Sequence, residues 1–505
     1  MRIATYRKIN TATLLGILML GVIIFSYFVL SKQSLRLDEA QSLWQTSHSL
    51  SRILHLVAGD VHVPVYHFLL HFWQLFWGSG VGTARLLSLI FFVATIPAVY
   101  ALGRLAYSSA VARFAAILIA ISPFLNWYAN EIRMYSLLTL LTVLNQYFFL
   151  RLFKDQNSTA KLWTGYVLTC IIGSFTHYFF AFGLLAQVIF ALLHRHHFIQ
   201  KKLHKKFIAT WFLLFFLMLG WGWYVLQVGE LNYSTPLLTA PTTINLFETF
   251  SQFIFGFQND HLNTLIVSLW PLTALLAFLS LSRNNRITPE TSFLVLTILI
   301  PIMGSFLFSI TVRPLYLTRY LILSVPSLYL FLSWIFSTYH PSLSRAIKGV
   351  VVAAMLLTFG HQMFSSQTPV KENFREVSQY LEKNATSQDV IVISAPFTIY
   401  PIEYYYHGPA PLSTIPSWNR FAQGAIPAFS EDKLVQEVTN LQSNHLRAWV
   451  VLSYNQGYEQ DIKLYFDTHF EQIEERNFSD GLNLYTYKLR YDFDEQQASK
   501  VSSSH

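Results

Sequence analysis

Residues 11–30 read TATLLGILMLGVIIFSYFVL, a run of 20 residues without a charged side chain. A helix of this length crosses the hydrocarbon core of a bilayer, which is about 30 Å thick. Arg2, Arg7 and Lys8 precede the run. It is longer than the core of a usual signal peptide, and no small-residue cleavage site stands before Lys32. We therefore expect an uncleaved first membrane helix.

The chain as a whole has the composition of a membrane protein. Of its 505 residues, 53% are hydrophobic and only 12% are charged, whereas a soluble domain is about 25% charged. Apolar runs recur along the first 365 residues, so the sequence predicts a mostly α-helical, polytopic bundle with about eleven spans. They lie near 11–30, 84–103, 112–128, 134–150, 162–178, 179–194, 207–226, 263–282, 292–311, 318–337 and 347–364.

Loop charges predict how this bundle is oriented. Cytoplasmic loops of membrane proteins are enriched in Lys and Arg, and a cytoplasmic N-terminus places most bases of this part inside. They are Arg2, Arg7, Lys8, Arg104, Arg113, Arg151, Lys154, Lys161, those from Arg195 to Lys206, Arg283, Arg286, Arg345 and Lys348. The stretch 194–206 can also be read as a polyanion site, but a cytoplasmic anchoring loop is the simpler interpretation. Most acidic residues of the bundle fall on the outer face.

The last third of the chain differs, because residues 371–505 hold 18 of the 27 acidic residues. We expect a small soluble α/β domain over 366–491, which the number of spans places outside the cytoplasm, and a disordered tail over 492–505. Residues 1–365 then form the membrane domain, with an outer loop at 31–83. The expected soluble elements are helices at 371–383 and 431–441 and strands at 390–394, 448–453 and 482–489.

Several classes of function find no support in the sequence. The single cysteine, Cys170, excludes an intramolecular disulfide. There is no glycine-rich phosphate loop for a nucleotide, and no basic stripe with interleaved aromatic residues for a nucleic acid. The expected partner is membrane lipid, and no nucleic acid.

The string LDEAQ at 37–41 follows the first predicted span. Two adjacent carboxylates repel each other, so retaining Asp38 and Glu39 in a pocket requires a partner or a task. Taking a proton from a sugar hydroxyl would be such a task. An ordinary solvated loop is the alternative.

A second polar string, GDVHVPVYHFLLHFW at 59–73, brings Asp60 and His62 to the start of an amphipathic helix. His67 and His71 are four residues apart, so they share one face of that helix. A carboxylate with nearby histidines can ligate a divalent metal. Histidines bonded to lipid or backbone at the membrane interface are the simpler interpretation, so we predict no metal ligand.

Two further strings place polar residues at outer ends of spans. Glu131 and Arg133 lie in SPFLNWYANEIRMYSLL at 122–138, where they can pair with each other or serve a site. His177 and Tyr178 lie in THYFF at 176–180, a tight outer turn. They can bind a hydroxylated ligand or satisfy the backbone of the turn.

The string RPLYLTRYLILSVPSLYLFL at 313–332 carries Arg313, Arg319 and Tyr320 in an aromatic outer loop. A guanidinium at the membrane interface is suited to a phosphate in the headgroup zone. Binding of a polyprenyl phosphate and snorkelling to ordinary lipid phosphate both fit this pattern.

In this order, the strings resemble the GT-C glycosyltransferases of family 39, the protein-mannosyltransferase and aminoarabinose-transferase type. The resemblance covers about 1–340, and RLLSLIFFVATIPAVYALGRLAYS at 85–108 contributes to it. It implies that Asp38 is the main catalytic carboxylate with Glu39 beside it, that Asp60 and Glu131 are further acids, and that Arg319 contacts the carrier phosphate. His62 is followed by Val63 before Pro64, whereas the family usually has His-Pro-Pro.

The resemblance implies transfer of a sugar from a polyprenyl-phosphate carrier to an acceptor on the extracytoplasmic face, with inversion and with Asp38 as base. The acceptor can be a glycan, a lipid or a protein. No cofactor is expected, and a divalent metal stays an alternative. Three other functions are left open: a transporter or flippase of a lipid-linked sugar, an oligosaccharide transferase that uses a pyrophosphate carrier, and a non-catalytic scaffold.

Overall fold

The computed structural model describes residues 10–30, 33–60, 62–155, 159–228, 238–259, 263–264, 268, 287–365, 371–421 and 426–490. The chain divides into two compact units. The first, which we call the bundle, holds residues 1–31, 48–229 and 236–369. The second, the α/β unit, holds residues 32–47, 230–235 and 370–505. Residues 32–47, part of the predicted outer loop, therefore group with the C-terminal domain.

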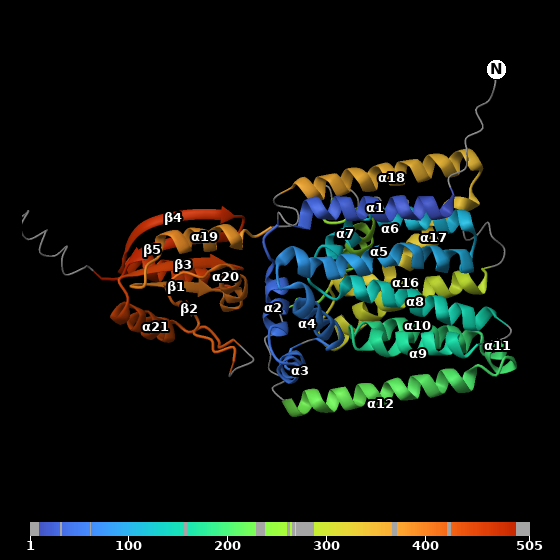
Figure 1. The fold of residues 1–505 in the computed structure, drawn as a ribbon, viewed down its shortest axis with the longest axis horizontal. Helices are drawn as coiled ribbons and strands as arrows, with labels where there is room; N and C mark the ends of the chain where they lie inside the picture. The colour runs from blue at the N-terminus through green and yellow to red at the C-terminus, as the bar shows by residue number, and fades with distance from the viewer. Residues whose placement is uncertain are drawn as a thin grey trace, which may run out of the picture. The chain divides into compact units, whose positions relative to one another are not determined.

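The described part of the bundle is helical (Figure 1). Its elements are α1 (Thr11–Leu30), α3 (Leu50–Ala58), α4 (Val65–Trp77), α5 (Val81–Ala106), α6 (Ser109–Ile121), α7 (Pro123–Ala129), α8 (Tyr135–Lys154), α9 (Ala160–Ser174), α10 (Phe180–Leu193), α11 (Arg195–Gln200), α12 (His204–Val228), α13 (Thr243–Phe255), α16 (Pro289–Thr311), η1 (Thr318–Ser324), α17 (Val325–Thr338) and α18 (Pro341–Phe364).

The predicted helical bundle is confirmed, and each predicted span within the described residues coincides with a helix. Seven helical segments of the described chain are long and apolar enough to cross a membrane, and the bent pair α6–α7 makes an eighth. Helices α9 and α10 have only 15 and 14 residues, about 22 Å at 1.5 Å per residue. The span predicted at 263–282 lies mostly outside the described residues.

The bend of 58° between α6 and α7 has a local cause. Ser122 has an extended backbone, and Pro123 begins α7 without an N–H to continue the α6 ladder. The Ser122 hydroxyl accepts a hydrogen bond from Leu125 N at 3.1 Å and receives one from the Tyr329 hydroxyl at 2.8 Å. The break is therefore held from α17.

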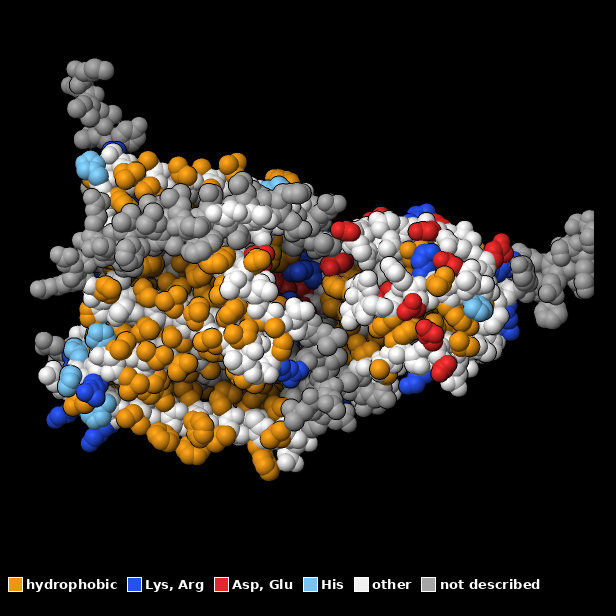
Figure 2. Space-filling model, turned by 180° about the vertical axis from the view of Figure 1, so that it is seen from behind, with side chains coloured by type: hydrophobic (Ala, Val, Ile, Leu, Met, Phe, Trp, Pro, Cys, Tyr) orange, Lys and Arg blue, Asp and Glu red, His pale blue; other side chains and the backbone are white. Residues whose placement is uncertain are grey.

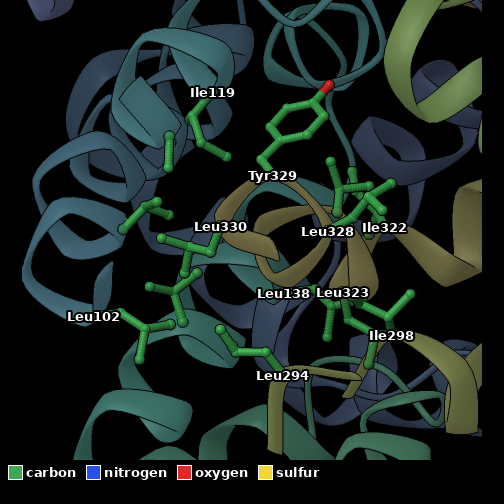
Figure 3. Close-up of a cluster of buried hydrophobic side chains, with 14 of the residues drawn as sticks. Leu102, Ile119, Leu138, Leu294, Ile298, Ile322, Leu323, Leu328, Tyr329 and Leu330 are labelled. Atoms are coloured by element: carbon green, nitrogen blue, oxygen red, sulfur yellow. The ribbon is translucent and has the colours of Figure 1, made fainter. Parts of the chain in front are cut away.

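The hydrophobic core lies where α5, α6, α8, α16, η1 and α17 meet (Figure 3). Its buried side chains include Leu102, Ile119, Leu138, Leu294, Ile298, Ile322, Leu323, Leu328 and Leu330. Gly103 lets α5 approach its neighbours, because a Cβ there would come within 2.5 Å of the Leu330 side chain. The outer faces of α1, α12 and α18 expose apolar side chains such as Tyr27, Phe216 and Leu357. Figure 2 shows one such apolar surface, as expected for contact with lipid.

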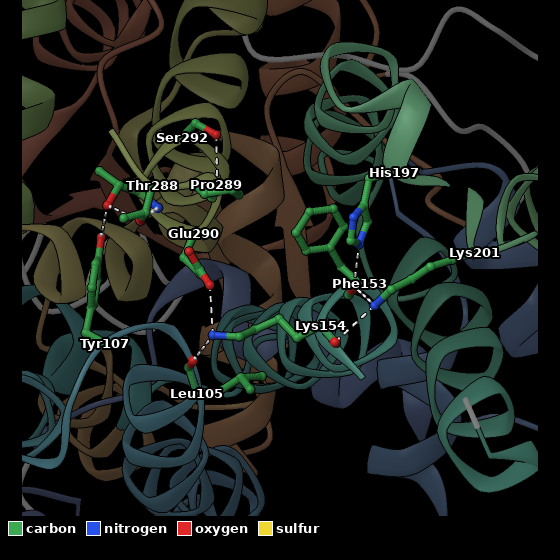
Figure 4. Close-up of polar contacts among 11 residues, drawn as sticks. Leu105, Tyr107, Phe153, Lys154, His197, Lys201, Thr288, Pro289, Glu290 and Ser292 are labelled. Atoms are coloured by element: carbon green, nitrogen blue, oxygen red, sulfur yellow. Dashed lines mark hydrogen bonds and ion pairs between the residues drawn. The ribbon is translucent and has the colours of Figure 1, made fainter. Parts of the chain in front are cut away.

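Cationic side chains gather at one end of the bundle, which we call the basic end. Lys154 pairs with Glu290 at 2.7 Å and donates to Leu105 O at 3.0 Å (Figure 4). Lys201 donates to the carbonyl oxygens of Phe153, Lys154 and Asp155 at the end of α8. These contacts neutralise the negative end of that helix.

The α/β unit contains a five-stranded sheet in the order β2-β1-β3-β5-β4. β1 (Asp389–Ser394) pairs in parallel with β2 (Leu412–Thr414) and β3 (Arg447–Ser453). β5 (Leu482–Lys488) is antiparallel to β3 and to β4 (Glu471–Ser479). The predicted strands at 390–394, 448–453 and 482–489 are β1, β3 and β5.

Helices cover both faces of this sheet. Ile391 and Ile393 of β1 face one core, with α19 (Phe374–Asn384) and α20 (Ile399–Tyr405). Val390 and Val392 face the other, with α21 (Glu431–Asn444) and α22 (Glu459–His469). The short η2 (Pro396–Thr398) precedes α20, and α2 (Leu37–Thr46) also belongs to this unit.

Candidate active site

A group of polar side chains lies at the end of the bundle opposite to the basic end. It comes from the loop before α4, the α7–α8 turn, the α9–α10 turn and the start of η1. A backbone hydrogen bond from Val65 N to Phe175 O, 3.0 Å long, ties α4 to the end of α9. We call the group the polar cluster. Its members are Asp60, His62, His67, Glu131, Arg133, His177, Tyr178, Arg319 and Tyr320.

Arg133 and His62 form the centre of the cluster. Nη2 of Arg133 lies 2.7 Å from Nε2 of His62, and both side chains are buried. A guanidinium only donates, so Nε2 accepts, which leaves Nδ1 as the only ring nitrogen of a neutral His62 that can carry the proton. Oδ2 of Asp60 is 3.9 Å from the same Nε2, and its side chain is 20% exposed. Asp60 therefore stands between buried groups and solvent.

The backbone of His62 is held by the α9–α10 turn, which is in turn bonded to α12. The Tyr178 hydroxyl donates to His62 O at 3.2 Å and accepts a hydrogen bond from Trp221 Nε1 at 2.8 Å. Trp221 lies in α12. The predicted residue Tyr178 thus contacts the cluster through the backbone of His62 rather than through that of its own turn, and its role toward a ligand stays a prediction.

The backbone of Arg133 is held in a similar way from α5. The Ser88 hydroxyl donates to Arg133 O at 3.2 Å. The Tyr66 hydroxyl of α4 lies 3.0 Å from the same Ser88 oxygen. Both hydroxyls are buried. The sequence did not single out Tyr66 or Ser88, because neutral hydroxyls in apolar helices carry no signal of their own.

His177 lies close to two guanidiniums. Its ring centroid is 5.1 Å from that of Tyr320, and Arg319 stacks over the Tyr320 ring at 5.6 Å. Burial lowers the pKa of His177 to about 3, and the positive charges of Arg133 and Arg319 contribute to that shift. Nδ1 accepts a hydrogen bond from Phe179 N at 3.1 Å. The neutral ring therefore carries its proton on Nε2, where it can donate.

His67 is also neutral. Its ring stacks on that of His62 at 5.8 Å between centroids. Burial lowers its pKa to about 3, and the neighbouring His62 and Arg133 lower it further, whereas Asp60 opposes the shift. His71, on the same helix, packs against Phe72. Within the described residues, no three His, Cys, Asp or Glu side chains are arranged to hold a metal ion.

Charged side chains of both signs are buried in this region. Arg85, Glu131 and Arg133 are all buried, Arg319 is partly buried, and Asp60 is mostly buried. The charges of Arg133 and Arg319 both act on His177, which is neutral like His67. A buried charge is costly unless a partner or counter-ion accompanies it. Guanidinium groups favour phosphate or carboxylate, so this pair of arginines suits an anion.

Arg85 was not among the predicted site residues. It lies in the first turns of α5, one turn before Ser88, and is 1% exposed. The signal that could have found it is a cation in the outer half of a 26-residue apolar helix whose other cation, Arg104, lies in the last turn, since a charge within a span is expensive unless it has a partner or a function.

Other predicted residues lie elsewhere. Arg313 is exposed in the stretch between α16 and η1. Asp38 and Glu39 belong to the α/β unit, in the first turn of α2, so this segment is a helix rather than a loop. Oε2 of Glu39 accepts a hydrogen bond from Arg36 N at 2.9 Å, and its side chain is fully buried. Glu39 thus caps the helix that carries Asp38. The catalytic roles of both acids stay predictions.

Comparison with known families gives a match over one part of the chain. Residues 61–221 match the model of the family described as dolichyl-phosphate-mannose-protein mannosyltransferase. This part contains every member of the polar cluster except Asp60, Arg319 and Tyr320. No curated protein matches the sequence.

Comparison of folds gives matches over nearly the whole chain. ArnT from Cupriavidus metallidurans in the apo state has a TM-score of 0.64 at 13% identity, covering 94% of this chain and 98% of that one. ArnT bound to undecaprenyl phosphate gives 0.62 at 12% identity with the same coverage. The Archaeoglobus fulgidus oligosaccharyltransferase tethered with an acceptor peptide gives 0.51 at 13%, covering 95% and 74%.

These matches confirm the resemblance to GT-C glycosyltransferases that the sequence indicated. The chain has the GT-C fold of ArnT, with a small C-terminal sheet, and is a multi-pass membrane protein. At 12–13% identity, the matched structures define the fold, and the site rests on the residues described above.

Proposed function

We propose that this protein transfers a sugar from a polyprenyl-phosphate carrier to an acceptor hydroxyl on the extracytoplasmic face of the membrane. One observation carries the proposal. At one end of an apolar bundle, the guanidiniums of Arg133 and Arg319 both lie close to the neutral ring of His177. A phosphate whose tail stays in lipid is the anion that fits such a place.

In this proposal the phosphate of the carrier lies between Arg133 and Arg319, and Nε2–H of His177 donates a further hydrogen bond to it. Charge-assisted hydrogen bonds of this kind are about twice as strong as neutral ones. Undecaprenyl phosphate is bound by ArnT, whose fold this chain shares, which supports a phosphate carrier of the same chemistry here.

The transfer itself is a direct displacement. Asp38 takes the proton from the acceptor hydroxyl, whose oxygen attacks the anomeric carbon of the sugar. The bond between that carbon and the phosphate oxygen breaks, and the leaving phosphate keeps the electron pair. Arg133 and Arg319 stabilise the charge that develops on it. A single displacement inverts the anomeric centre.

The two other acids have different surroundings and thus different tasks. Asp60 is 20% exposed and lies 3.9 Å from His62, so it can meet an acceptor that arrives from water. Glu131 is 3% exposed, so we assign it the task of a counter-charge to the buried guanidiniums. Asp60 is therefore the stronger candidate for direct contact with the acceptor.

The orientation follows from the basic end. Its cations, Lys154 and Lys201 among them, bond helix-end carbonyls and a surface carboxylate, and cations at loop ends favour the cytoplasmic side. The polar cluster, at the opposite end of the bundle, then faces away from the cytoplasm. This is the side on which the family resemblance places its chemistry.

The test is turnover of labelled donors by the purified full chain in lipid nanodiscs. A series of polyprenyl phosphates and pyrophosphates, each with a radiolabelled sugar, is scored for loss of the sugar–phosphate bond to water or to added acceptors. We expect cleavage of a monophosphate donor that Asp38→Asn abolishes. Asp432→Asn, at an exposed acid of α21, is the matched control and should retain activity.

Other results would favour other functions. A donor that crosses a vesicle membrane with its sugar bond intact would identify a flippase. Cleavage confined to pyrophosphate donors would identify an oligosaccharide transferase. Full activity of Asp38→Asn would remove this residue from the chemistry.

A further inference from the structure

The α/β unit has a distinctive place in its sheet, the switch point between β1 and β3. The chain leaves β1 toward β2 through α20, on one face of the sheet, and reaches β3 through α21, on the other. In open α/β sheets, ligands bind outside the carboxyl ends of the strands at such a point. We call this region the switch-point edge.

The residues that end these strands are unusual. Ser394 and Ser453 close β1 and β3, and both are buried, with hydroxyls that meet no hydrogen-bond partner among the described residues. Tyr454 follows directly with φ of 55°, a left-handed conformation that costs energy for a residue with a bulky side chain. Its ring packs against Phe397, which follows β1, at 5.7 Å. Strain of this kind persists where surrounding structure enforces it.

The switch-point edge is in contact with a distant part of the same chain, residues 33–47. The Ser34 hydroxyl accepts a hydrogen bond from Arg375 N, at the start of α19, at 3.1 Å. Leu35 N donates to the Tyr405 hydroxyl of α20 at 2.9 Å. Arg375 also donates to Gln33 O at 3.3 Å. These contacts fix the approach to α2.

The far end of α2 is held by aromatic and cationic contacts. The Trp44 ring lies 5.1 Å from that of Tyr400, at the start of α20. The guanidinium of Arg420 lies 5.0 Å from the Trp44 centroid and 5.1 Å from the Tyr400 centroid. Phe421 adds a ring contact to Trp44 at 5.7 Å. Cation–π contacts of this kind are attractive and hold the rings in place.

Tyr454 lies near the first turn of α2, which carries Asp38 and Glu39 and stands between the two sets of contacts just described. Burial raises the pKa of its phenol, and the Glu372 carboxylate, to which the phenol is hydrogen-bonded, raises it further. The charges of Arg36 and Asp38 act on the same phenol in opposite directions. Tyr454 is therefore neutral and donates to Glu372. Its ring packs against the core that α19 and β3 line.

We propose that the C-terminal α/β unit holds the catalytic acid, Asp38, in place. Residues 33–47 lie at the switch-point edge, where such domains bind a ligand. Tyr454 is a positioning residue for Asp38. The chain's own segment takes the ligand's place. The α/β unit then serves the transfer by fixing the direction of one carboxylate. This rests on the proposed function only for the role of Asp38 in catalysis.

The test compares Tyr454→Ala and Tyr454→Phe with Tyr458→Phe and Tyr458→Ala in the full chain. Tyr458 is a matched control because it is a half-buried tyrosine of the same unit, stacked on Phe429 at 4.7 Å. The first measurement is amide hydrogen exchange over residues 37–46. We expect Tyr454→Ala to speed this exchange about tenfold and Tyr458→Ala to leave it unchanged.

The second measurement is turnover of the labelled donor. Because a shift of about 1 Å at a reacting group can cost up to a hundredfold, we expect Tyr454→Ala to lower kcat about tenfold or more with donor KM unchanged. Tyr454→Phe keeps the ring and should recover most of the loss. Neither Tyr458 variant should alter kcat.

The outcomes separate the two proposals. Unchanged amide hydrogen exchange over residues 37–46 in Tyr454→Ala would overturn the proposal that the α/β unit holds this segment in place, whatever the activity. Faster exchange with unaltered kcat would overturn the positioning role of Tyr454. If the wild-type chain cleaves no donor, the proposed function fails by itself, and the exchange measurement still decides whether the α/β unit holds residues 33–47.

Discussion

The two ends of the bundle carry cations in opposite surroundings. At the basic end, Lys154 is 36% exposed, and Lys154 and Lys201 bind helix-end carbonyls. At the end with the polar cluster, Arg133 is 3% exposed and bonds a buried, neutral histidine. Exposed ion pairs contribute about 0–1 kcal/mol, whereas loss of one partner from a buried pair costs about 3–5 kcal/mol.

This difference separates anchoring from chemistry. A cation at the basic end can be exchanged for another solvated group at small cost, since water replaces its partners. Burial of a cation in the polar cluster costs the free energy of its hydration. Fixed hydrogen-bond partners or a bound anion must compensate this loss. Burial thus distinguishes two groups of charges that the sequence presents alike. The following predictions test this contrast.

The largest effect is expected from Arg133→Gln. It removes one donor to the carrier phosphate and a partner of His62, so kcat/KM should fall by about a hundredfold to a thousandfold, as for loss of one donor in other anion-stabilising sites. Turnover of the labelled donor measures this. An Arg133→Gln enzyme that keeps its melting temperature and its activity would mean that the polar cluster is not the active site.

Acidification is expected to have the next largest effect. His67 and His177 have pKa values near 3 in the folded protein, against 6.5 ordinarily. Below pH 6.5 these two histidines are protonated in the unfolded chain but stay neutral in the folded chain. The free energy of unfolding therefore falls as the pH falls. Between pH 6.5 and 4.5 the loss is about 2.3 kcal/mol for each histidine.

The melting temperature in detergent, measured across that pH range, checks this loss. His177→Gln should make the fall shallower, since glutamine does not titrate. His196→Gln, an exposed histidine of α11 at the basic end, should leave the slope unchanged. Equal slopes for both variants would show that the two ends do not differ in this respect.

Arg319→Ala should have a smaller effect than Arg133→Gln, because Arg319 is only partly buried and water can replace it. We expect donor KM to rise about tenfold, the value of one charge-assisted contact, with a smaller change in kcat. Arg319→Lys should restore part of the affinity. Arg313→Ala, at an exposed cation of the same loop, tests whether any outer cation suffices, and we expect less than about a threefold change.

The smallest effect is expected from Lys154→Gln. Its ion pair with Glu290 is partly exposed, so the loss of stability should be no more than about 1 kcal/mol, with turnover unchanged. A shift in melting temperature as large as that of Arg133→Gln would contradict the contrast between the two ends.

Strongly patterned elements were predictable from the sequence. Long apolar runs marked the spans, and strands such as β1 and β3 stood out because their central residues are all apolar and buried. β4 was missed, since its residues Glu471–Ser479 are mostly exposed on an edge strand and show no alternation. Helix α2 was missed because ten residues, LDEAQSLWQT, are too short and polar to show a helical period.

The site was predictable in its residues more than in its arrangement. Asp60, His62, Arg133, His177 and Arg319 stood out as polar groups at outer ends of apolar segments, where they carry a cost. Their contacts depend on packing between helices far apart in sequence, such as the 71 residues that separate His62 from Arg133. Sequence spacing within one helix carries no information on such pairs.

The grouping of residues 32–47 with the C-terminal third has a consequence for biosynthesis. Ser34 and Arg375 are 341 residues apart, and Leu35 and Tyr405 are 370 apart. At about 5–20 residues per second, a ribosome needs roughly 20–70 s to make the chain between them. Helix α1 is made long before these partners. Residues 32–47, which follow it, therefore cannot form their contacts with the α/β unit until translation is almost finished. A prematurely terminated chain would reach the membrane without the α/β unit that holds the first turn of α2, so we expect it to be inactive.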